Sequence, residues 1–173
     1  MKIIKKTVFV ITFLFIGLLV YYFYPDYKLP KNAQVDSIVV YKSKRAMLLY
    51  FNGKLVKIYT IALGRNPIGA KEVEGDRKTP EGMYYINDKN PNSGWHKNLG
   101  ISYPNATDRK RAKQLGKATG GDIKIHGLQN KRGFVSKFHR WKDWTLGCIA
   151  VTSDEVDELY RAVKIGTPIE IKP

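Results

Sequence analysis

The first apolar pattern in the chain is an uninterrupted run near its start. Residues 7–24 carry no charged side chain, and three lysines precede them. A helix of this length spans about 27 Å, which is close to the hydrocarbon thickness of a bilayer. Aromatic residues at 21–24 end the run, where an aromatic belt would lie at the membrane interface. We therefore expect a transmembrane helix at 7–24 behind a cytoplasmic basic stub at 1–6.

Two observations bear on the orientation and fate of this helix. The lysines before it place the N-terminus in the cytoplasm by the positive-inside rule, so the remainder of the chain is expected outside. A cleaved signal peptide is the alternative, but the run is long for one and no small-residue cleavage site follows it. We expect an uncleaved anchor, then a polar, proline-containing linker at 25–33 and a folded domain at 34–173.

Beyond the linker the pattern changes to short apolar or alternating stretches, which predict strands. Asn52-Gly53 separates two of them and is a strong hairpin signal. A turn at 79–82 leads into another. The predicted strands lie at 37–41, 46–51, 55–63, 83–87, 122–126, 149–151 and 169–171.

Helical spacing is confined to the second half of the chain. Thr152 and Glu155 fit a capping box, and apolar residues then follow at 156, 159, 160 and 163. A shorter helix is expected near 107–115. Together these elements predict one mainly β domain with one or two packed helices.

Composition and charge narrow the possible partners. The 173 residues suffice for one ordinary domain, and 43% hydrophobic content with 12% aromatics excludes wholesale disorder. The net charge of +15 favours nucleic acid, a lipid surface or an acidic polymer such as cell wall. The expected export opposes nucleic acid, and no zinc-finger, homeodomain or RNA-recognition motif is visible. Basic residues dominate 109–144, either as a plain solvated face or as a surface for anionic wall polymer.

Catalytic chemistry depends on the single cysteine, Cys148, which cannot form a disulfide within the chain. A lone cysteine is often only a buried core thiol, so its neighbours must decide. His126 ends one predicted strand and Cys148 begins another, which could bring imidazole and thiol within hydrogen-bond reach. Gly147 would permit close backbone approach, with the Gly147 and Cys148 amides directed at a developing oxyanion. This arrangement suits acyl transfer.

At these residues the chain resembles L,D-transpeptidase catalytic domains of the YkuD type. That family combines a His-Gly pair with a downstream Ser/Thr-His-Gly-Cys segment and a following hydrophobic residue. The likeness extends to a hairpin at 38–64 and a glycine-bounded Thr-Pro turn at 75–82, and covers roughly 35–172. It implies a YkuD-like β-sandwich or barrel. The matching motif residues are His126, Gly127, Thr145, Gly147, Cys148 and Ile149.

Two positions depart from the family pattern. Leu146 stands where a second histidine is usual, and Ala150 where arginine or asparagine is usual. The family's general base is the first histidine, which is His126 here. We therefore expect His126 to act alone, with Leu146 packing against the catalytic strand as an apolar spacer. The departures are compatible with an altered substrate or a hydrolytic preference.

The resemblance implies a two-step acyl transfer on peptidoglycan stem peptides. Cys148 attacks the third-residue carbonyl of a tetrapeptide stem, D-Ala leaves with a proton from His126, and an amine then accepts the acyl group to form a cross-link. The Gly127 carbonyl is expected to orient the imidazole. Two alternatives stay open: hydrolysis of the same thioester by an L,D-carboxypeptidase or amidase, or a non-catalytic wall-binding membrane protein.

The remaining expectations concern substrate, metal and location. The basic loop between His126 and Cys148 is expected to touch substrate, while His96 and His139 are expected at the surface. The three histidines and one cysteine lack metal-site spacing, so we expect no metal and no cofactor. The protein is expected to be a single-pass cytoplasmic-membrane protein with its catalytic domain outside; its oligomeric state stays open. Candidate substrate-binding residues are Lys131, Arg132, Trp144 and Thr145.

Overall fold

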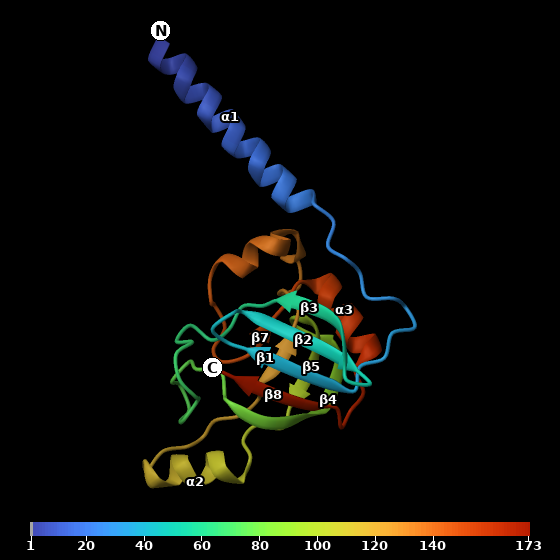
Figure 1. Ribbon diagram of the computed structural model, residues 1–173. Coiled ribbons are helices and arrows are strands. Elements are labelled where there is room, and N and C mark those ends of the chain that lie inside the picture. Colours follow the sequence, from blue (N-terminus) through green and yellow to red (C-terminus); the bar gives the residue numbers. More distant parts are fainter. Residues whose placement is uncertain (1) are drawn as a thin grey trace.

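The computed structural model describes residues 2–173; Met1, the first residue of the expected basic stub, lies outside them. The chain begins with α1 (Lys2–Phe23), which stands away from the rest of the protein (Figure 1). Within it, Ile4–Phe23 is long and apolar enough to cross a membrane, and none of this stretch is buried inside the described chain. The helix thus forms where the uncharged run predicted one.

The domain is built on one eight-stranded sheet in the order β3-β2-β1-β8-β4-β5-β6-β7. The β1–β8 and β6–β7 pairs are parallel, and the other pairs are antiparallel. In chain order the strands are β1 (Ser37–Tyr41), β2 (Ala46–Phe51), β3 (Lys54–Thr60), β4 (Gly82–Ser93), β5 (His96–Ile101), β6 (Lys124–His126), β7 (Ile149–Ala150) and β8 (Pro168–Lys172).

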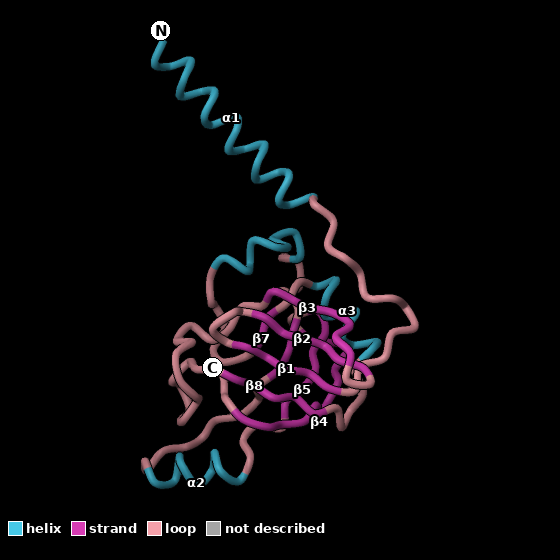
Figure 2. Tube along the Cα trace, in the orientation of Figure 1, coloured by secondary structure: helices cyan, strands magenta, loops and turns pink. Residues whose placement is uncertain are grey.

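The two edges of this sheet approach each other. Ala62, just after edge strand β3, forms an isolated antiparallel bridge with Ala150 of edge strand β7. Its N–H donates to the Ala150 carbonyl at 3.0 Å, and the Ala150 N–H donates back at 2.8 Å. The sheet therefore curls into a half-barrel, as the Cα trace shows (Figure 2). The mainly β prediction is confirmed, and the curl brings the β6–β7 region beside the loop after β3.

Alternation along the strands supplies the core. Ile38 and Val40 of β1, and Ile169 and Ile171 of β8, point to the buried side, while their neighbours are half exposed. Full burial of such a side chain contributes roughly 1.5–3 kcal/mol relative to leaving it in water. This period of two is the pattern from which the sequence predicted strands at these positions.

One central strand, β5, was not predicted. It begins with His-Lys-Asn and contains Gly100, so its intrinsic strand propensity is low. Tertiary pairing overrides that propensity, because β5 is bonded on both sides, to β4 and to β6. Gly100 also has a packing role: a Cβ there would lie 2.6 Å from Asn87 Oδ1.

Three shorter helical segments complete the domain. α2 (Ala106–Gln114) and α3 (Ser153–Ala162) lie close to the predicted helices, and both begin with a capping box. The box of α3 is the predicted Thr152–Glu155 pair, and α3 packs against β5 and β6. The 3₁₀ segment η1 (Gly133–Trp141) was not expected, and Ser136 interrupts it with φ 45° and ψ −129°. η1 lies beneath the end of α1, in orange in Figure 1.

Candidate active site

Neighbouring parallel strands bring Cys148 and His126 together. β6 and β7 pair with Ile125 opposite Ile149 and His126 opposite Ala150. Continued by one residue, this register places Cys148 opposite Lys124, two positions before His126 on the same face of the sheet. With strands about 4.8 Å apart and a rise of about 3.3 Å per residue, the two Cα atoms are diagonal neighbours at about 8 Å. Thiol and imidazole side chains can meet across that distance.

A backbone carbonyl fixes the His126 ring. Nδ1 lies 2.7 Å from the Gly127 carbonyl oxygen, which can only accept a hydrogen bond. Nδ1 therefore carries the proton, and Nε2 of the neutral ring is left to accept one. His126 is 6% exposed, and its burial lowers the pKa of the imidazole from the ordinary value. At neutral pH the ring is uncharged and able to act as a base.

The Cys148 thiol lies beside the chain that leads into β6. It donates to the Asp122 carbonyl oxygen at 3.7 Å. Burial, supported by the negative charge of Asp122, raises the pKa of the thiol, although the Lys124 amide opposes this shift. Within residues 2–173 no hydrogen bond joins Cys148 to His126. Catalytic hydrogen bonds often tighten only when substrate binds, and here the uncharged thiol must lose its proton during the attack.

The loop before Cys148 is held by the segment after β3. Asp143 accepts the Leu63 N–H at 2.9 Å and pairs with Arg45 at 2.6 Å. The Thr145 N–H donates to the Leu63 carbonyl at 3.1 Å, so the loop is fixed at two points before Cys148. These contacts link residues 80 to 98 positions apart and explain how the half-barrel positions Cys148.

Gly147 forms the turn that leads into Cys148. Its φ is +137°, and a Cβ there would lie 2.8 Å from the Lys78 carbonyl oxygen, so only glycine fits without a shift. Its N–H donates to Thr145 Oγ1 at 3.1 Å, while the Thr145 hydroxyl donates to the Cys148 carbonyl at 2.8 Å. In this conformation the Gly147 amide serves the turn and not the expected oxyanion, which leaves the Cys148 amide as the candidate donor.

A cavity of about 630 Å³ opens over both residues. Its walls include three basic side chains, Arg65, Lys124 and Arg132, and one acid, Asp122, which pairs with Lys124 at 2.8 Å. The excess of positive charge suits a ligand that carries carboxylates. The complete lining is Arg65, Ser93, Trp95, Asn98, Asp122, Lys124, His126, Leu128, Gln129, Arg132, Val135, His139, Trp144, Thr145, Leu146 and Cys148.

Three aromatic rings gather near the His126 imidazole. Trp95 and Trp144 lie 5.1 and 5.6 Å from the His126 ring, and 5.3 Å from each other, between ring centroids. His139 meets Trp144 edge-on at 6.5 Å. Burial, and then the charges of Arg140 and His126, lower the pKa of His139 to about 4. A second uncharged imidazole thus lies near that of His126.

Several polar atoms in the cavity wall lack partners in the described chain. They are Asn98 Oδ1, both ring nitrogens of His139 and Trp144 Nε1. Buried polar groups are nearly always hydrogen-bonded, so a cluster of exceptions calls for an explanation. Groups of this kind beside a cavity are those that a polar ligand could pair after a modest side-chain shift.

The structure corrects several expectations. Leu146 is 69% exposed at the cavity wall, so its expected role as a packed spacer is wrong. His139 is 6% exposed, so its expected surface position is wrong as well, whereas His96 is partly exposed and pairs with Asp157. Of the four candidate substrate-binding residues, Arg132, Trp144 and Thr145 line the cavity and Lys131 does not.

Sequence reasoning missed Trp95, Asn98 and Arg65 because they lie far from the Cys148 motif in the chain. Trp95 directly precedes the unpredicted strand β5, Asn98 lies within that strand, and Arg65 follows β3. The only signal for Arg65 was its position directly after the hairpin at 38–64 that resembles the family. Across residues 2–173, no group of three or more His, Cys, Asp or Glu side chains could hold a metal ion.

Comparisons with known proteins identify the family of the domain. Residues 36–171 match the YkuD family model, which describes the L,D-transpeptidase catalytic domain. YafK of Escherichia coli (strain K12), provisionally named an L,D-transpeptidase, is 30% identical over 144 residues, or 80% of this chain and 51% of YafK. YqjB of Bacillus subtilis (strain 168), named in the same way, is 26% identical over 137 residues, or 78% of this chain and 69% of YqjB.

A solved structure shows the same arrangement of elements. The helical cell shape determining protein Pgp2 from Campylobacter jejuni matches with a TM-score of 0.60 and 27% identity. The match covers 82% of this chain and 49% of Pgp2. This chain therefore spans about half the length of YafK and of Pgp2.

Proposed function

Because this chain belongs to the YkuD family of L,D-transpeptidase catalytic domains, we propose that it is a cysteine acyltransferase that remodels peptidoglycan. Cys148 is the nucleophile and His126 is its base. The observation that carries the proposal is the Nδ1–H···O=C bond of 2.7 Å from His126 to Gly127, which leaves Nε2 as the accepting nitrogen beside Cys148 in one cavity.

In the first step, Cys148 Sγ attacks the carbonyl carbon of the third residue in a tetrapeptide stem. The thiol proton passes to His126 Nε2, so charge develops only as the new C–S bond forms. The Cys148 amide is the candidate donor to the oxyanion of the tetrahedral intermediate. The C–N bond then breaks, His126 returns the proton to the leaving amine, and D-Ala departs from a thioester.

In the second step, an amine from another stem attacks the thioester carbonyl. His126 accepts the proton of the incoming amine and delivers it to the departing sulfur, which restores the thiol. The product is an amide cross-link. If water takes the place of the amine, the product is a shortened stem with a free carboxylate, which is L,D-carboxypeptidase chemistry.

The cavity supports a stem peptide as the ligand. Arg65, Lys124 and Arg132 supply positive charge for the carboxylates of such a peptide. Trp95 and Trp144 supply apolar walls, and the unpaired atoms of Asn98 and Trp144 supply hydrogen-bonding capacity for its amides. The Thr145 hydroxyl, bonded to the Cys148 carbonyl, positions the nucleophile more than it contacts ligand.

We also propose that α1 anchors the enzyme in the cytoplasmic membrane and that the domain at 34–173 works outside, on the periplasmic or wall side. The span Ile4–Phe23 and the lysines before it support this topology. The linker at 25–33 then leads directly from the bilayer to the domain. A location at the cell wall agrees with the name of Pgp2, the helical cell shape determining protein.

Mass spectrometry of purified muropeptides incubated with the wild-type chain and with Cys148→Ala tests the function. We expect loss of D-Ala from tetrapeptide stems and new dimers with the wild type, and neither with the variant. Shortened stems without dimers would show that the protein is a hydrolase and not a transferase. A wild-type chain that leaves all stems intact would refute the proposal.

Thiol reactivity separates an enzyme from a wall-binding protein that only retains the fold. Iodoacetamide should alkylate Cys148 in the folded wild-type chain faster than it does in His126→Ala, because the base assists formation of the thiolate. Equal rates in both chains, or an inert thiol, would favour the non-catalytic alternative.

A further inference from the structure

The segment η1 lies between the membrane end of α1 and the catalytic cavity. The Tyr22 hydroxyl donates to the Phe134 carbonyl at 2.9 Å, and the rings of Tyr21 and Tyr22 each lie 5.7 Å from Phe138. Tyr21 also lies 5.8 Å from Trp141. Tyr21 and Tyr22 belong to the last turns of α1, so η1 lies at the level where the candidate membrane span ends.

This segment has two different sides. Val135 and His139 line the cavity. Phe138 and Trp141 contact each other edge-on at 4.9 Å on the side of α1. Trp141 is 63% exposed and Phe134 is 72% exposed. Soluble domains usually bury neighbouring large aromatic rings, so this exposure is unusual. Aromatic rings at the end of a membrane span are typical of the bilayer interface.

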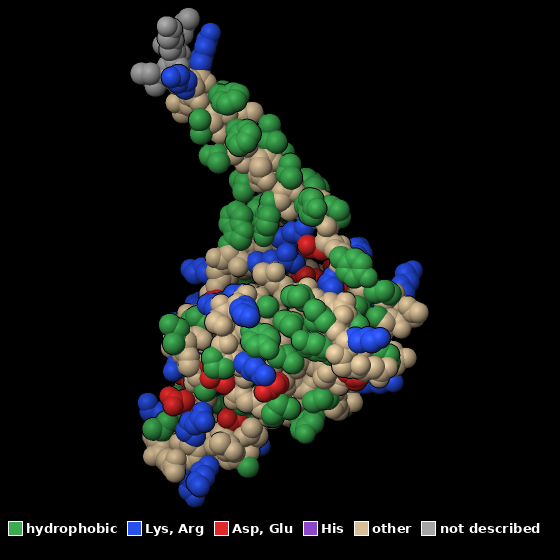
Figure 3. All heavy atoms as spheres, viewed as in Figure 1, with side chains coloured by type: hydrophobic (Ala, Val, Ile, Leu, Met, Phe, Trp, Pro, Cys, Tyr) green, Lys and Arg blue, Asp and Glu red, His purple; other side chains and the backbone are tan. Residues whose placement is uncertain are grey.

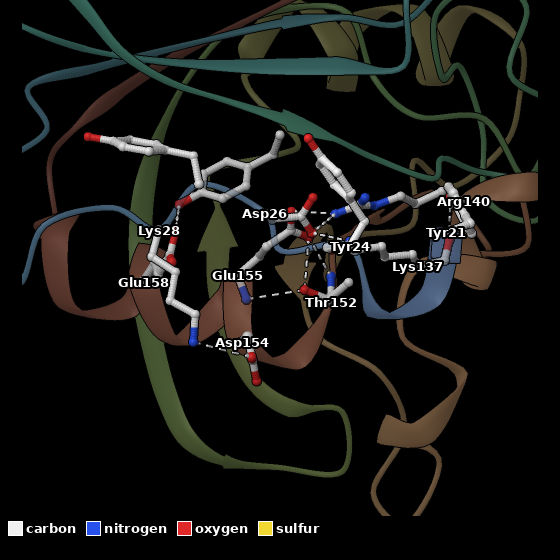
Figure 4. Close-up of polar contacts among 12 residues, drawn as sticks. Tyr21, Tyr24, Asp26, Lys28, Lys137, Arg140, Thr152, Asp154, Glu155 and Glu158 are labelled. Atoms are coloured by element: carbon white, nitrogen blue, oxygen red, sulfur yellow. Dashed lines mark hydrogen bonds and ion pairs between the residues drawn. The ribbon is translucent and has the colours of Figure 1, made fainter. Parts of the chain in front are cut away.

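The acidic side chains near η1 are already neutralised within the protein. Asp26 of the linker pairs with Lys137 and Arg140, each at 3.4 Å, and Arg140 also binds Glu155 at 2.6 Å (Figure 4). Lys137 further donates to the Tyr24 carbonyl oxygen. These bonds lock the linker onto η1, so the segment keeps a fixed position relative to the start of the domain.

Other basic residues around η1 remain available. Lys131 and Lys142 are exposed, and neither of them forms an ion pair with any residue from 2 to 173. In the space-filling view, Lys and Arg side chains lie beneath the lower end of the apolar helix α1 (Figure 3). We name the set Phe134, Phe138, Trp141, Lys131 and Lys142 the aromatic–basic surface.

We propose that the aromatic–basic surface docks onto the anionic phospholipid headgroups of the membrane that α1 crosses. Its rings enter the interface beside Tyr21 and Tyr22, and its two lysines meet lipid phosphates. The proposal rests on α1 as a membrane span and is independent of the chemistry at Cys148. Because His139 projects from the other side of η1, docking would hold the cavity about one helix diameter, roughly 10 Å, from the headgroups.

Quenching of tryptophan fluorescence by brominated lipids tests the docking in the full-length chain reconstituted into vesicles of phosphatidylcholine and phosphatidylglycerol. α1 contains no tryptophan, and of the three tryptophans only Trp141 belongs to the surface. We expect clear quenching of the wild type and loss of more than half of it in Trp141→Phe. Trp144→Phe is the matched control and should retain the quenching, since Trp144 faces the cavity.

Equal quenching in Trp141→Phe and wild type would overturn the docking. So would an unquenched wild type that floats with the vesicles after alkaline carbonate washing, because its helix is then inserted while the surface stays in water. A wild-type chain that does not float with the vesicles would refute α1 as a membrane span, and it would refute the docking as well.

A charge test addresses the lipid class. The double change Lys131→Gln and Lys142→Gln should reduce quenching in anionic vesicles to the level of purely zwitterionic ones. The matched control removes two lysines from exposed positions of α2, at the far end of the domain from α1 (Figure 1), and should leave quenching unchanged. Equal effects of both double variants would show attraction by net charge alone and would refute a defined docking surface. The control positions are Lys110 and Lys113.

Discussion

Replacing the buried imidazole of His139 should change how the protein responds to acid. His139 is 6% exposed, neither ring nitrogen has a partner in the described chain, and burial is the main cause that lowers its pKa to about 4. In the unfolded chain the ordinary pKa is about 6.5. Between these values the unfolded state binds a proton that the folded state does not, so stability falls as pH falls.

The size of this effect follows from the shift. One pKa unit corresponds to about 1.4 kcal/mol, so a fall from about 6.5 to about 4 represents about 3 kcal/mol, of which about 2.5 kcal/mol is lost by about pH 4.5. In His139→Phe the ring volume is largely kept while the titrating nitrogens are removed. The variant should match or exceed the wild type in stability near neutral pH, since neither ring nitrogen of His139 has a hydrogen-bond partner in the described chain that the change would remove.

Urea unfolding of the full-length chain in detergent, followed by circular dichroism at about pH 7 and about pH 4.5, measures the difference. The pH-dependent loss of unfolding free energy should be about 2 kcal/mol smaller in His139→Phe than in the wild type. Val135→Ala, a change in the same segment without a titrating group, should lower stability equally at both pH values. Equal pH-dependent losses of unfolding free energy in the wild type and His139→Phe would refute the claim that the His139 imidazole is buried and unpaired.

Four further outcomes are expected. Cys148→Ser should release no D-Ala from tetrapeptide stems in the muropeptide assay while keeping its circular dichroism spectrum, because an alcohol is far harder to deprotonate than a thiol. The kcat/KM should rise with pH through a pKa below the ordinary histidine value, because burial lowers the pKa of His126. It should not decline until strongly alkaline pH, because burial raises the pKa of Cys148; a rise of kcat/KM centred above pH 7 would contradict this. His126→Ala should reduce kcat/KM by about 10²–10⁴, the usual range for a general base, and a near-normal rate would identify another base. Leu146→Ala should change unfolding free energy by about 0.5 kcal/mol or less, because the side chain is 69% exposed; a loss of several kcal/mol in urea unfolding would mean that it is packed.

The predictable part of the fold is the part with strong local periodicity. Local sequence signals a few residues long predict three parts of the fold. These parts are the Asn52-Gly53 hairpin, the alternating strands β1 and β8, and the capped helix α3. β5 could not be predicted in this way, because its pairing on both sides outweighs a polar, glycine-containing sequence. η1 was missed for a related reason: its position depends on aromatic contacts with α1 and on ion pairs with Asp26 and Glu155.

The candidate site divides in the same way. His126, Gly127 and Cys148 could be proposed from the sequence because motif spacing and chemistry coincide at them, and the bond of Gly127 to the imidazole follows the expected geometry. The walls were not found, because Arg65 and Trp95 reach the cavity only through the curl of the sheet. Burial of side chains in the loop could not be read from the sequence either, since charged neighbours surround His139.

Because of η1, the leucine at position 146 does not leave the cavity with a single histidine. The position before Gly147 carries an exposed leucine, yet the cavity still contains two imidazoles, because His139 enters its wall from the intervening segment. His139 is held there by its neighbour Arg140, which Glu155 and the linker residue Asp26 bind. A change in the linker can therefore reach the cavity through the Asp26–Arg140 ion pair and one short segment. It follows that kinetics of His126→Ala identify the base only when compared with the His126→Ala/His139→Phe double variant, whose additional loss measures what the second imidazole supplies.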